Sequence, residues 1–297
     1  MQQGLVKLIY SLQTNPCDDM FKDRKLIIAT KHKKESVIAP ILEESLGVVC
    51  QIDEGFDSDE FGTFTGEIER LHDPISTARR KCLKAMQSNG CDLGIASEGS
   101  FGPHPFIISI PSDEEFLIFI DSLHGLEIIV RELSATTNFS GKEVQYDTEL
   151  DEFAEKAGFP THGLILRKSK YSNEEIYKNI TNHESLHDTF QQIISKYDTA
   201  YIETDMRAMY NPTRMGIIKK TTHKLVEKIK SKCPKCEMPG FGIVYSKKGL
   251  PCRLCGSPTE STLSHIYICQ HCEYTVEKVH PNSRTNEDPR YCNNCNP

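Results

Sequence analysis

Four Cys-x-x-Cys pairs in the last third of the chain constrain this sequence more than any other feature. They are Cys233/Cys236, Cys252/Cys255, Cys269/Cys272 and Cys292/Cys295. Each pair can place two thiolates on one tetrahedral ion at about 2.3 Å, and four thiolates complete a structural zinc site. The eight cysteines therefore predict two structural zinc ions. Pro234, Pro251 and Gly256 lie where zinc ribbons turn tightly.

The four pairs can combine into two zinc sites in more than one way. The segments from Cys236 to Cys252 and from Cys272 to Cys292 each have room for a hairpin. We therefore expect the pairs to combine in sequence order, as two zinc ribbons. An interleaved cross-brace, in which the first pair joins the third and the second joins the fourth, stays open. Disulfides are not expected, because no secretory segment opens the chain and such pairs in the cytosol usually bind metal or do redox work.

Composition indicates a soluble protein of two or three domains. The chain has 297 residues, 38% hydrophobic and 26% charged, which suffices for a substantial core beside a zinc region. No apolar run reaches the roughly 18 residues that a transmembrane helix needs, so we expect a cytoplasmic protein without a membrane partner. The formal charge of −7 argues against a protein that mainly coats nucleic acid. We expect a lead-in at 1–24, an α/β domain at 25–232 and the zinc region at 233–297.

The middle of the chain alternates strands and helices, as is typical of an α/β domain. Short apolar runs predict strands at 25–30, 48–52, 92–96, 106–110, 116–120, 127–133, 163–167 and 199–203. Helical patterns lie at 35–46, from Pro74 to about 86, and at 147–157, 173–180, 187–196 and 214–232.

Charged and hydroxyl side chains follow two of the first strands. An open α/β sheet binds its ligand outside the carboxyl ends of its strands. Thr30 with Lys31, Lys33 and Lys34, at the start of a helix, forms a candidate phosphate cradle. In the loop 97–102, glycines permit close backbone approach, and Glu98 is a candidate to bind magnesium or orient a water.

Two further segments carry candidate site residues. An acidic run at 53–60 is followed by Glu67, and magnesium takes one or two carboxylates at a time, so Glu67 and Glu98 are candidate magnesium ligands. The turn at 203–214 contributes Asp205, Arg207 and Arg214, and an arginine fork suits bidentate phosphate recognition. Internal salt bridges are the alternative explanation for this turn.

In order and spacing, these landmarks resemble the inosine-triphosphate pyrophosphatase-like superfamily. Ile28-Ala29-Thr30-Lys31-His32 resembles its Ala-Thr-x-Asn phosphate loop, although His32 replaces the asparagine and Glu35 falls at its loop lysine. Thr77-Ala78-Arg79-Arg80-Lys81-Cys82 resembles its Asn-Ala-x-x-Lys-Ala helix motif. Glu98 falls at its acidic loop, and 203–214 resembles its closing Ala-Glu to Ser-His-Arg stretch. The resemblance implies a mixed-sheet domain that cleaves nucleoside triphosphates with magnesium. With two zinc ribbons behind it, the arrangement resembles an uncharacterised bacterial family.

Two functions from different classes are expected. In the first, a magnesium-dependent nucleotide hydrolase binds a phosphorylated small molecule where Thr30, Lys31, Lys81, Glu98 and Arg214 converge. Lys33 and Arg207 also contact phosphate, Asp205 or Glu98 positions the attacking water, and the zinc ribbons are scaffold or a homodimer contact. In the second, the ribbons are an adaptor for nucleic acid or protein, and the α/β domain is a nucleotide sensor. The basic helix at 214–232 favours the adaptor, whereas the nearly balanced charge of the zinc region does not.

Overall fold

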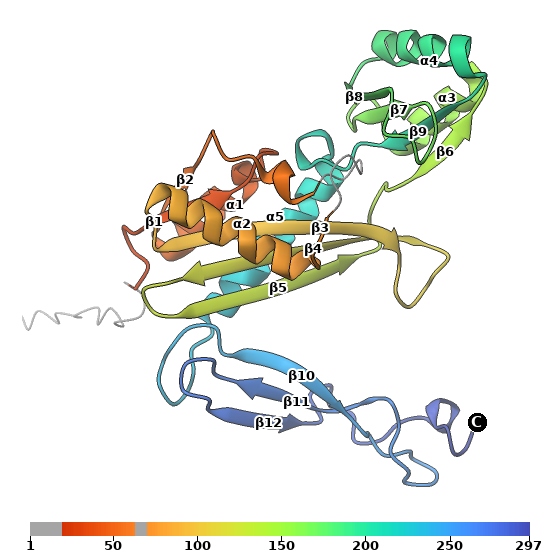
Figure 1. Ribbon diagram of the computed structural model, residues 1–297. Helices are drawn as coiled ribbons and strands as arrows, with labels where there is room; N and C mark the ends of the chain where they lie inside the picture. Colours follow the sequence, from red (N-terminus) through yellow and green to blue (C-terminus); the bar gives the residue numbers. More distant parts are fainter. Residues whose placement is uncertain (1–19, 63–69) are drawn as a thin grey trace, which may run out of the picture.

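Three β-sheets organise the chain in the computed structural model, which describes residues 20–62 and 70–297 (Figure 1). A five-stranded sheet forms the centre, a four-stranded sheet forms a separate lobe, and a three-stranded sheet carries the cysteine pairs. No helix within the described residues combines the length and apolarity needed to cross a membrane.

The central sheet has the order β2-β1-β3-β4-β5 and is mixed, with parallel pairs around β1 and antiparallel pairs from β3 to β5. Its strands are β1 (Lys25–Ala29), β2 (Val49–Ile52), β3 (Leu93–Pro103), β4 (Pro111–Asp121) and β5 (Leu126–Ser134). The predicted α/β class with a mixed sheet is therefore confirmed.

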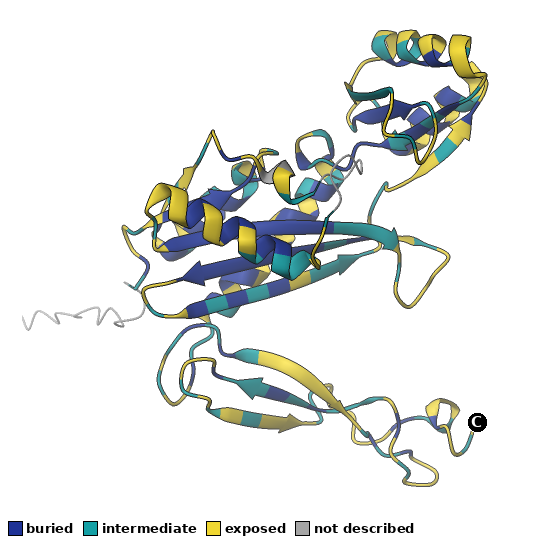
Figure 2. Ribbon diagram, viewed as in Figure 1, coloured by how far each residue is buried: buried dark blue, intermediate teal, exposed yellow. Residues whose placement is uncertain are grey.

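Helices cover both faces of the central sheet. α1 (Glu35–Leu46) and α5 (Pro212–Lys230) pack on one face and α2 (Pro74–Asn89) on the other, while the short η1 (Ser58–Phe61) lies beside α2. Side chains alternate along each strand, so Ile95 joins the core under α1 and α5, and Ala96 joins the core under α2. Figure 2 shows this sheet as the most deeply buried part of the molecule. The lead-in reaches this core too, because Phe21 is buried in it.

The second sheet is antiparallel, with the order β6-β9-β7-β8, and has its own apolar core under two helices. Its elements are β6 (Gly141–Val144), α3 (Asp147–Ala157), β7 (Leu164–Arg167), β8 (Ile176–Ile180), α4 (His183–Tyr197) and β9 (Ala200–Thr204). The chain enters this lobe after β5 and returns from β9 through η2 (Ala208–Tyr210) into α5.

Three predicted elements are wrong. Residues 97–102, predicted as a loop after a strand, continue β3, because they pair with β4 as far as Pro103. Residues 106–110 lie between β3 and β4 instead of forming a strand, and Phe106 is 86% exposed there, because the long hairpin of β3 and β4 turns at this point. Residues 176–180, predicted as part of a helix, form β8, since Ile180 is buried against the second core and the strand pairs with β7.

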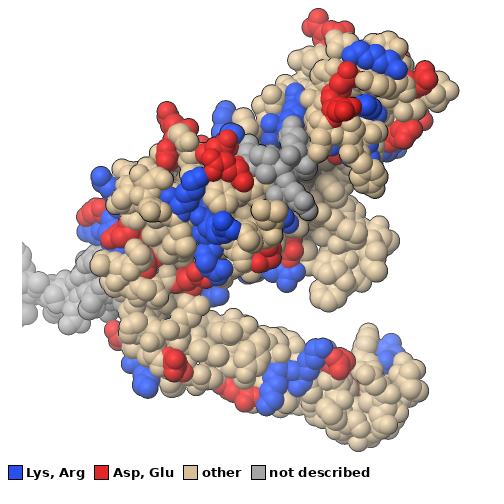
Figure 3. Space-filling view, in the orientation of Figure 1, with Lys and Arg blue, Asp and Glu red and all other residues tan. Residues whose placement is uncertain are grey.

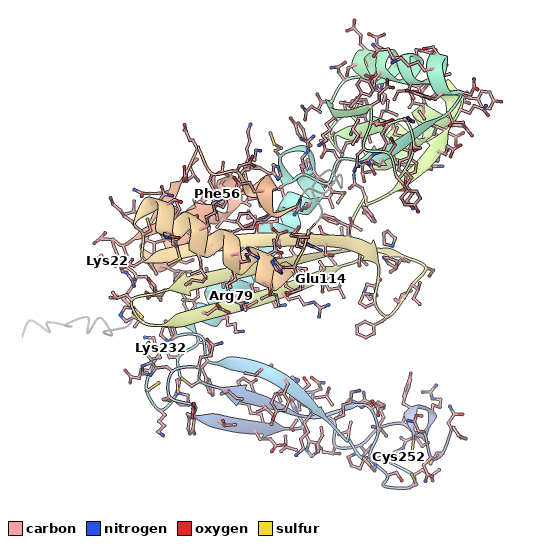
Figure 4. The ribbon with its side chains drawn as sticks, viewed as in Figure 1. Lys22, Phe56, Arg79, Glu114, Lys232 and Cys252 are labelled. Atoms are coloured by element: carbon pink, nitrogen blue, oxygen red, sulfur yellow. The ribbon has the colours of Figure 1, made fainter. Side chains whose placement is uncertain are left out.

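The three-stranded antiparallel sheet follows α5 and has the order β10-β11-β12. Its strands are β10 (Gly242–Lys248), β11 (Thr262–Ile268) and β12 (Thr275–Val279), with η3 (Pro289–Tyr291) near the end of the chain. Figure 4 labels Lys232 beside the central domain and Cys252 at the far end of this sheet. The near end is held to the centre, because Met238 packs on the core of the central sheet and Gly240 lies against Ile128 of β5.

Candidate functional site

Two groups of four cysteines could each hold a zinc ion. Within each group the sulfurs lie within 4.8 Å of one another, and the groups are Cys233, Cys236, Cys269 and Cys272, and Cys252, Cys255, Cys292 and Cys295. Sulfur pairs across the first group are 3.7 Å and 3.6 Å apart, and across the second 3.9 Å and 3.6 Å apart. Two ligands at 2.3 Å from a tetrahedral ion would be about 3.8 Å apart. The geometry therefore suits four-thiolate zinc.

The backbone of each group also supports a metal site. The amide of Lys235 donates to the sulfur of Cys233, and the amide of Leu254 donates to that of Cys252, each over 3.4 Å. Such donors reduce the negative charge on a thiolate and stabilise the ionised form that a metal requires. After the second cysteine of a pair, Gly256 has a φ of 74°, a conformation that glycine adopts without strain.

The predicted pairing in sequence order is wrong, and the interleaved cross-brace is present. The segment between the first and second pairs is not a hairpin, because it contains β10, which runs in one direction for 7 residues. A strand of that length carries the second pair about 23 Å from the first. β11 then runs back and returns the third pair to the first, so the two groups lie at opposite ends of one sheet. We call them the proximal group (with Cys233) and the distal group (with Cys252).

A cavity of about 280 Å³ lies where the central sheet and the second sheet meet. Its lining comes from the carboxyl ends of β1 and β3, the start of α1, α2, and the segment that leaves β9. We call it the cleft. Among the predicted site residues, those that line it are Thr30, Lys31, Lys81, Glu98, Asp205 and Arg207.

Lys34 is the most informative side chain of the cleft. It lies at the start of α1, is only 7% exposed, and donates a hydrogen bond of 2.8 Å to the hydroxyl of Ser97. Within residues 20–62 and 70–297 it forms no ion pair with a carboxylate. Burial, followed by the positive charge of Arg214, lowers its pKa to about 8. The cleft therefore contains a buried ammonium group whose charge is not neutralised directly by any side chain that the structure describes.

Glu98 projects from β3 toward α2. It forms an ion pair with Lys81, and Arg70 lies 3.8 Å from its other oxygen while donating to the carbonyl of Gly99. The side chains of Glu98 and Lys81 are only 6% and 9% exposed. Both predicted residues therefore lie in the cleft, and they lie there as a pair.

The two carboxylates from the second sheet are also paired. Asp205 is fully buried and accepts hydrogen bonds from the amide of Arg207 over 3.0 Å and from its side-chain Nε over 2.9 Å. Glu203 pairs with Arg167, although burial raises the pKa of Glu203 more than Arg167 lowers it. The predicted alternative of internal salt bridges therefore describes much of this segment.

Three predicted residues do not join the others. Arg214 is fully buried on the α1 and α5 face, where its Nε donates to Glu115 over 2.6 Å, whereas Glu98 points to the opposite face. The predicted convergence of Glu98 and Arg214 is therefore wrong, because neighbouring positions along β3 point to opposite faces. Lys33 is exposed and lies outside the cleft lining. Glu67 lies outside the described residues.

The described residues give no support for a magnesium site in the cleft. Magnesium takes carboxylate oxygens in octahedral geometry. The carboxylates of the cleft, Glu98, Glu203 and Asp205, are each paired with a cation of the protein. Among the described residues, the groupings of possible metal ligands are the two cysteine groups. No catalytic step is therefore assigned to magnesium.

Sequence reasoning missed the aromatic wall of the cleft. Phe101 and Phe139 both line it, with ring centroids 5.7 Å apart and an interplanar angle of 31°. Arg70 was also missed. Neither Phe139 nor Arg70 lies in a motif, and each reaches the cleft from a segment distant in sequence from the strand ends that the motifs mark.

Comparison with known proteins shows the family to which this chain belongs but does not show an activity. No curated protein matches the sequence. The family described as a domain of unknown function, DUF6671, matches residues 81–297, which include β3, the second sheet, α5 and both cysteine groups. Because this match covers well over half of the 297 residues, the chain belongs to the DUF6671 family.

Proposed function

We propose that the cleft binds the phosphate groups of a small phosphorylated molecule of the nucleotide class. The observation that carries the proposal is the buried ammonium of Lys34, which has a hydroxyl neighbour and no carboxylate partner among the described residues. A phosphate would supply the missing negative charge through charge-assisted hydrogen bonds. The start of α1 adds the positive end of a helix dipole at the same place.

The charges of the described lining residues agree with an anionic ligand. Five basic side chains and three carboxylates line the cleft. The basic side chains are Lys31, Lys34, Arg70, Lys81 and Arg207, and the carboxylates are Glu98, Glu203 and Asp205. Charge elsewhere is mixed, since Figure 3 shows acidic and basic side chains interspersed over the face in view. The cleft is therefore a better candidate for phosphate than the outer surface of the zinc region.

A planar ring is the second group that the cleft suits. The Phe101 and Phe139 rings lie against one another and line the cleft beside its polar side chains. Aromatic side chains stack on nucleobases because every base has a π-face. This wall supports a nucleotide over a simple sugar phosphate.

Hydrolysis of a phosphoanhydride bond is the reaction that the resemblance implies, and Glu98 is the better candidate to orient the water. A phosphate entering the cleft competes for Lys81 and frees an oxygen of Glu98. Asp205 is less suited, since both of its oxygens accept hydrogen bonds from Arg207.

Calorimetry with a matched pair of lysine variants tests the binding step. Lys34→Met removes the buried charge and keeps the side-chain length, whereas Lys33→Met removes the exposed charge next to it. Hydrogen bonds to charged groups contribute about 1.5–3 kcal/mol, so Lys34→Met should weaken nucleoside triphosphate binding about ten- to a hundredfold. Lys33→Met should bind like the wild type. Equal affinities for the two variants would contradict the proposal.

A second arm tests turnover. Release of phosphate and pyrophosphate is measured with a panel of nucleoside triphosphates, with and without magnesium, for the wild type and Glu98→Gln. Hydrolysis that is lost in Glu98→Gln supports the enzyme hypothesis. Binding without turnover in either protein makes the domain a sensor, as the adaptor hypothesis expects, and no binding at all contradicts the proposal.

A further inference from the structure

Two carboxylates lie side by side on β4, deep beneath the cleft. Asp113 and Glu115 are 1% and 0% exposed and are two positions apart, so both point to the α1 and α5 face. Within the described residues, both oxygens of Asp113 and the Oε2 of Glu115 lack a hydrogen-bond donor. Buried acceptors without donors are rare and unfavourable. This pair therefore needs an explanation that the proposed function does not supply.

The charged groups that face the pair come from two helices. Arg214 of α5 donates to the Oε1 of Glu115 over 2.6 Å, and Lys34 at the start of α1 is the other cation near Asp113. On the neighbouring strands, the residues opposite Asp113 are Phe101 and Ser134, neither of which carries charge. Burial, followed by the charge of Glu115, raises the pKa of Asp113 to about 8.

We propose that Asp113 is protonated at neutral pH and donates a hydrogen bond to Glu115, so that the pair shares one proton and positions Arg214 under the cleft. A protonated carboxyl is a donor as well as an acceptor, so one proton from solvent satisfies Glu115 without a further side chain. Glu115 then carries the single negative charge that faces the guanidinium. Asp113 and Glu115 are positioning residues, because neither lines the cleft.

Arg214 connects this pair to both walls of the cleft. Its Nη1 donates to the carbonyl of Met206, and its guanidinium lies 5.0 Å from the Phe101 ring. A Cβ on Gly99 would meet its Nη2 at 2.4 Å, so the guanidinium lies directly against the backbone there. Gly99, Phe101 and Met206 all line the cleft. The position of Arg214 therefore sets the shape of the phosphate site.

The shared proton also sets the charge under the cleft, and this step rests on the proposed function. With Asp113 neutral, the charges of Lys34, Arg214 and Glu115 leave one net positive charge. With Asp113 ionised, the four groups sum to zero. Loss of the proton should therefore weaken the binding of an anion as well as the fold.

The pH dependence of unfolding tests the proton directly. The pKa of Asp113 is raised in the folded state, so its contribution is fully present below about pH 4 and is lost as the pH rises to about 8. The pKa of Lys34 is lowered and acts in the opposite sense, but only between about 8 and its ordinary value of 10.5. The pH ranges in which Asp113 and Lys34 change the stability therefore do not overlap.

Asp113→Asn is the informative variant, because its amide donates to Glu115 and cannot ionise. Urea unfolding followed by circular dichroism between pH 5 and 8 gives the slope of the unfolding free energy against pH, and this slope counts the protons released on unfolding. The wild type should release about one more proton than Asp113→Asn. Infrared spectra at pH 7 should show a protonated carboxyl band in the wild type that Asp113→Asn lacks. Glu115→Gln should be destabilised at every pH, since Arg214 loses its buried partner.

The contradicting results are equally specific. If Asp113→Asn has the same pH slope as the wild type, or if the wild type shows no protonated carboxyl band, Asp113 is ionised and the proposal is wrong. These two measurements use no ligand, so they decide whether Asp113 is protonated even if the cleft binds no phosphate. Inorganic pyrophosphate, titrated by calorimetry at pH 7 and 8, is the probe for the binding step. The wild type should lose more affinity with pH than Asp113→Asn.

Discussion

The two cysteine groups should differ sharply in what they stabilise, because one adjoins the central domain and the other does not. Cys272→Ser removes a ligand from the proximal group and Cys295→Ser removes one from the distal group, and both cysteines are half-buried. We expect Cys272→Ser to weaken the central domain, and Cys295→Ser to loosen the far end of the zinc region alone.

The size of the difference follows from the contacts at the near end. Loss of the proximal zinc releases the turn that holds Met238 on the central core and Gly240 against Ile128. Met238 is only partly buried, so its release should cost about half of the 1.5–3 kcal/mol that full burial of such a side chain contributes. In a domain of this size, 1 kcal/mol lowers Tm by about 2–4 °C. Cys272→Ser should therefore lower the Tm of the central domain by roughly 2–6 °C.

Hydrogen exchange followed by mass spectrometry shows which segments of the central domain are destabilised when the proximal zinc is lost. In Cys272→Ser, amides in β5 and in the last turns of α5 should exchange faster than in the wild type, because these segments contact the released turn. In Cys295→Ser they should exchange at the wild-type rate. Equal protection of β5 in both variants would show that the proximal group is as independent of the core as the distal group, which would refute this reasoning.

Three further predictions test other parts of the structure. Gly99→Ala places a Cβ against the Arg214 guanidinium and should lose about 1–3 kcal/mol in urea unfolding, whereas Gly102→Ala, which meets nothing within 4 Å, should be nearly neutral. Elemental analysis of protein purified without added metal should give two zinc ions per chain, and one or none would contradict the cysteine geometry. Arg24→Met should lose about 3–5 kcal/mol, because it removes two hydrogen bonds of 2.8 Å from a fully buried Asp121. Burial alone would raise the pKa of Asp121, but Arg24 and His124 hold it below its usual 3.8. The stability that the ion pair contributes is therefore present above about pH 4 and is lost below it. A stability difference between wild type and Arg24→Met that does not change in acid would count against the pair.

The sequence predicts the zinc ligands well because their chemistry is local. Two cysteines three positions apart make a chelating pair whatever surrounds them, and all eight lie in the two groups. The pairing is not local, since it depends on whether the segment after Cys236 turns back or runs on as a strand. β10 runs on, and its apolar run Ile243-Val244-Tyr245 favours a strand without showing which cysteine pair that strand leads to.

The cleft was partly predictable for a related reason. The predicted strand ends identify Thr30, Lys31 and Glu98, and all three line the cleft, although Glu98 lies within β3 and not after it. The face to which each side chain points depends on one-residue register, so the sequence could not tell that Arg214 and Glu98 lie on opposite faces. The same limit applies to Lys33 and Lys34, which look alike in the sequence, although one is exposed and the other is buried.

The most direct test of the central claim is a crystal structure of the protein with a non-hydrolysable nucleoside triphosphate. The account predicts phosphate oxygens within hydrogen-bonding distance of the Lys34 ammonium and the Ser97 hydroxyl, with the base near Phe101 and Phe139. A nucleotide bound to the zinc region, or a cleft in which Lys34 keeps Ser97 as its partner while the phosphates bind elsewhere, would contradict it.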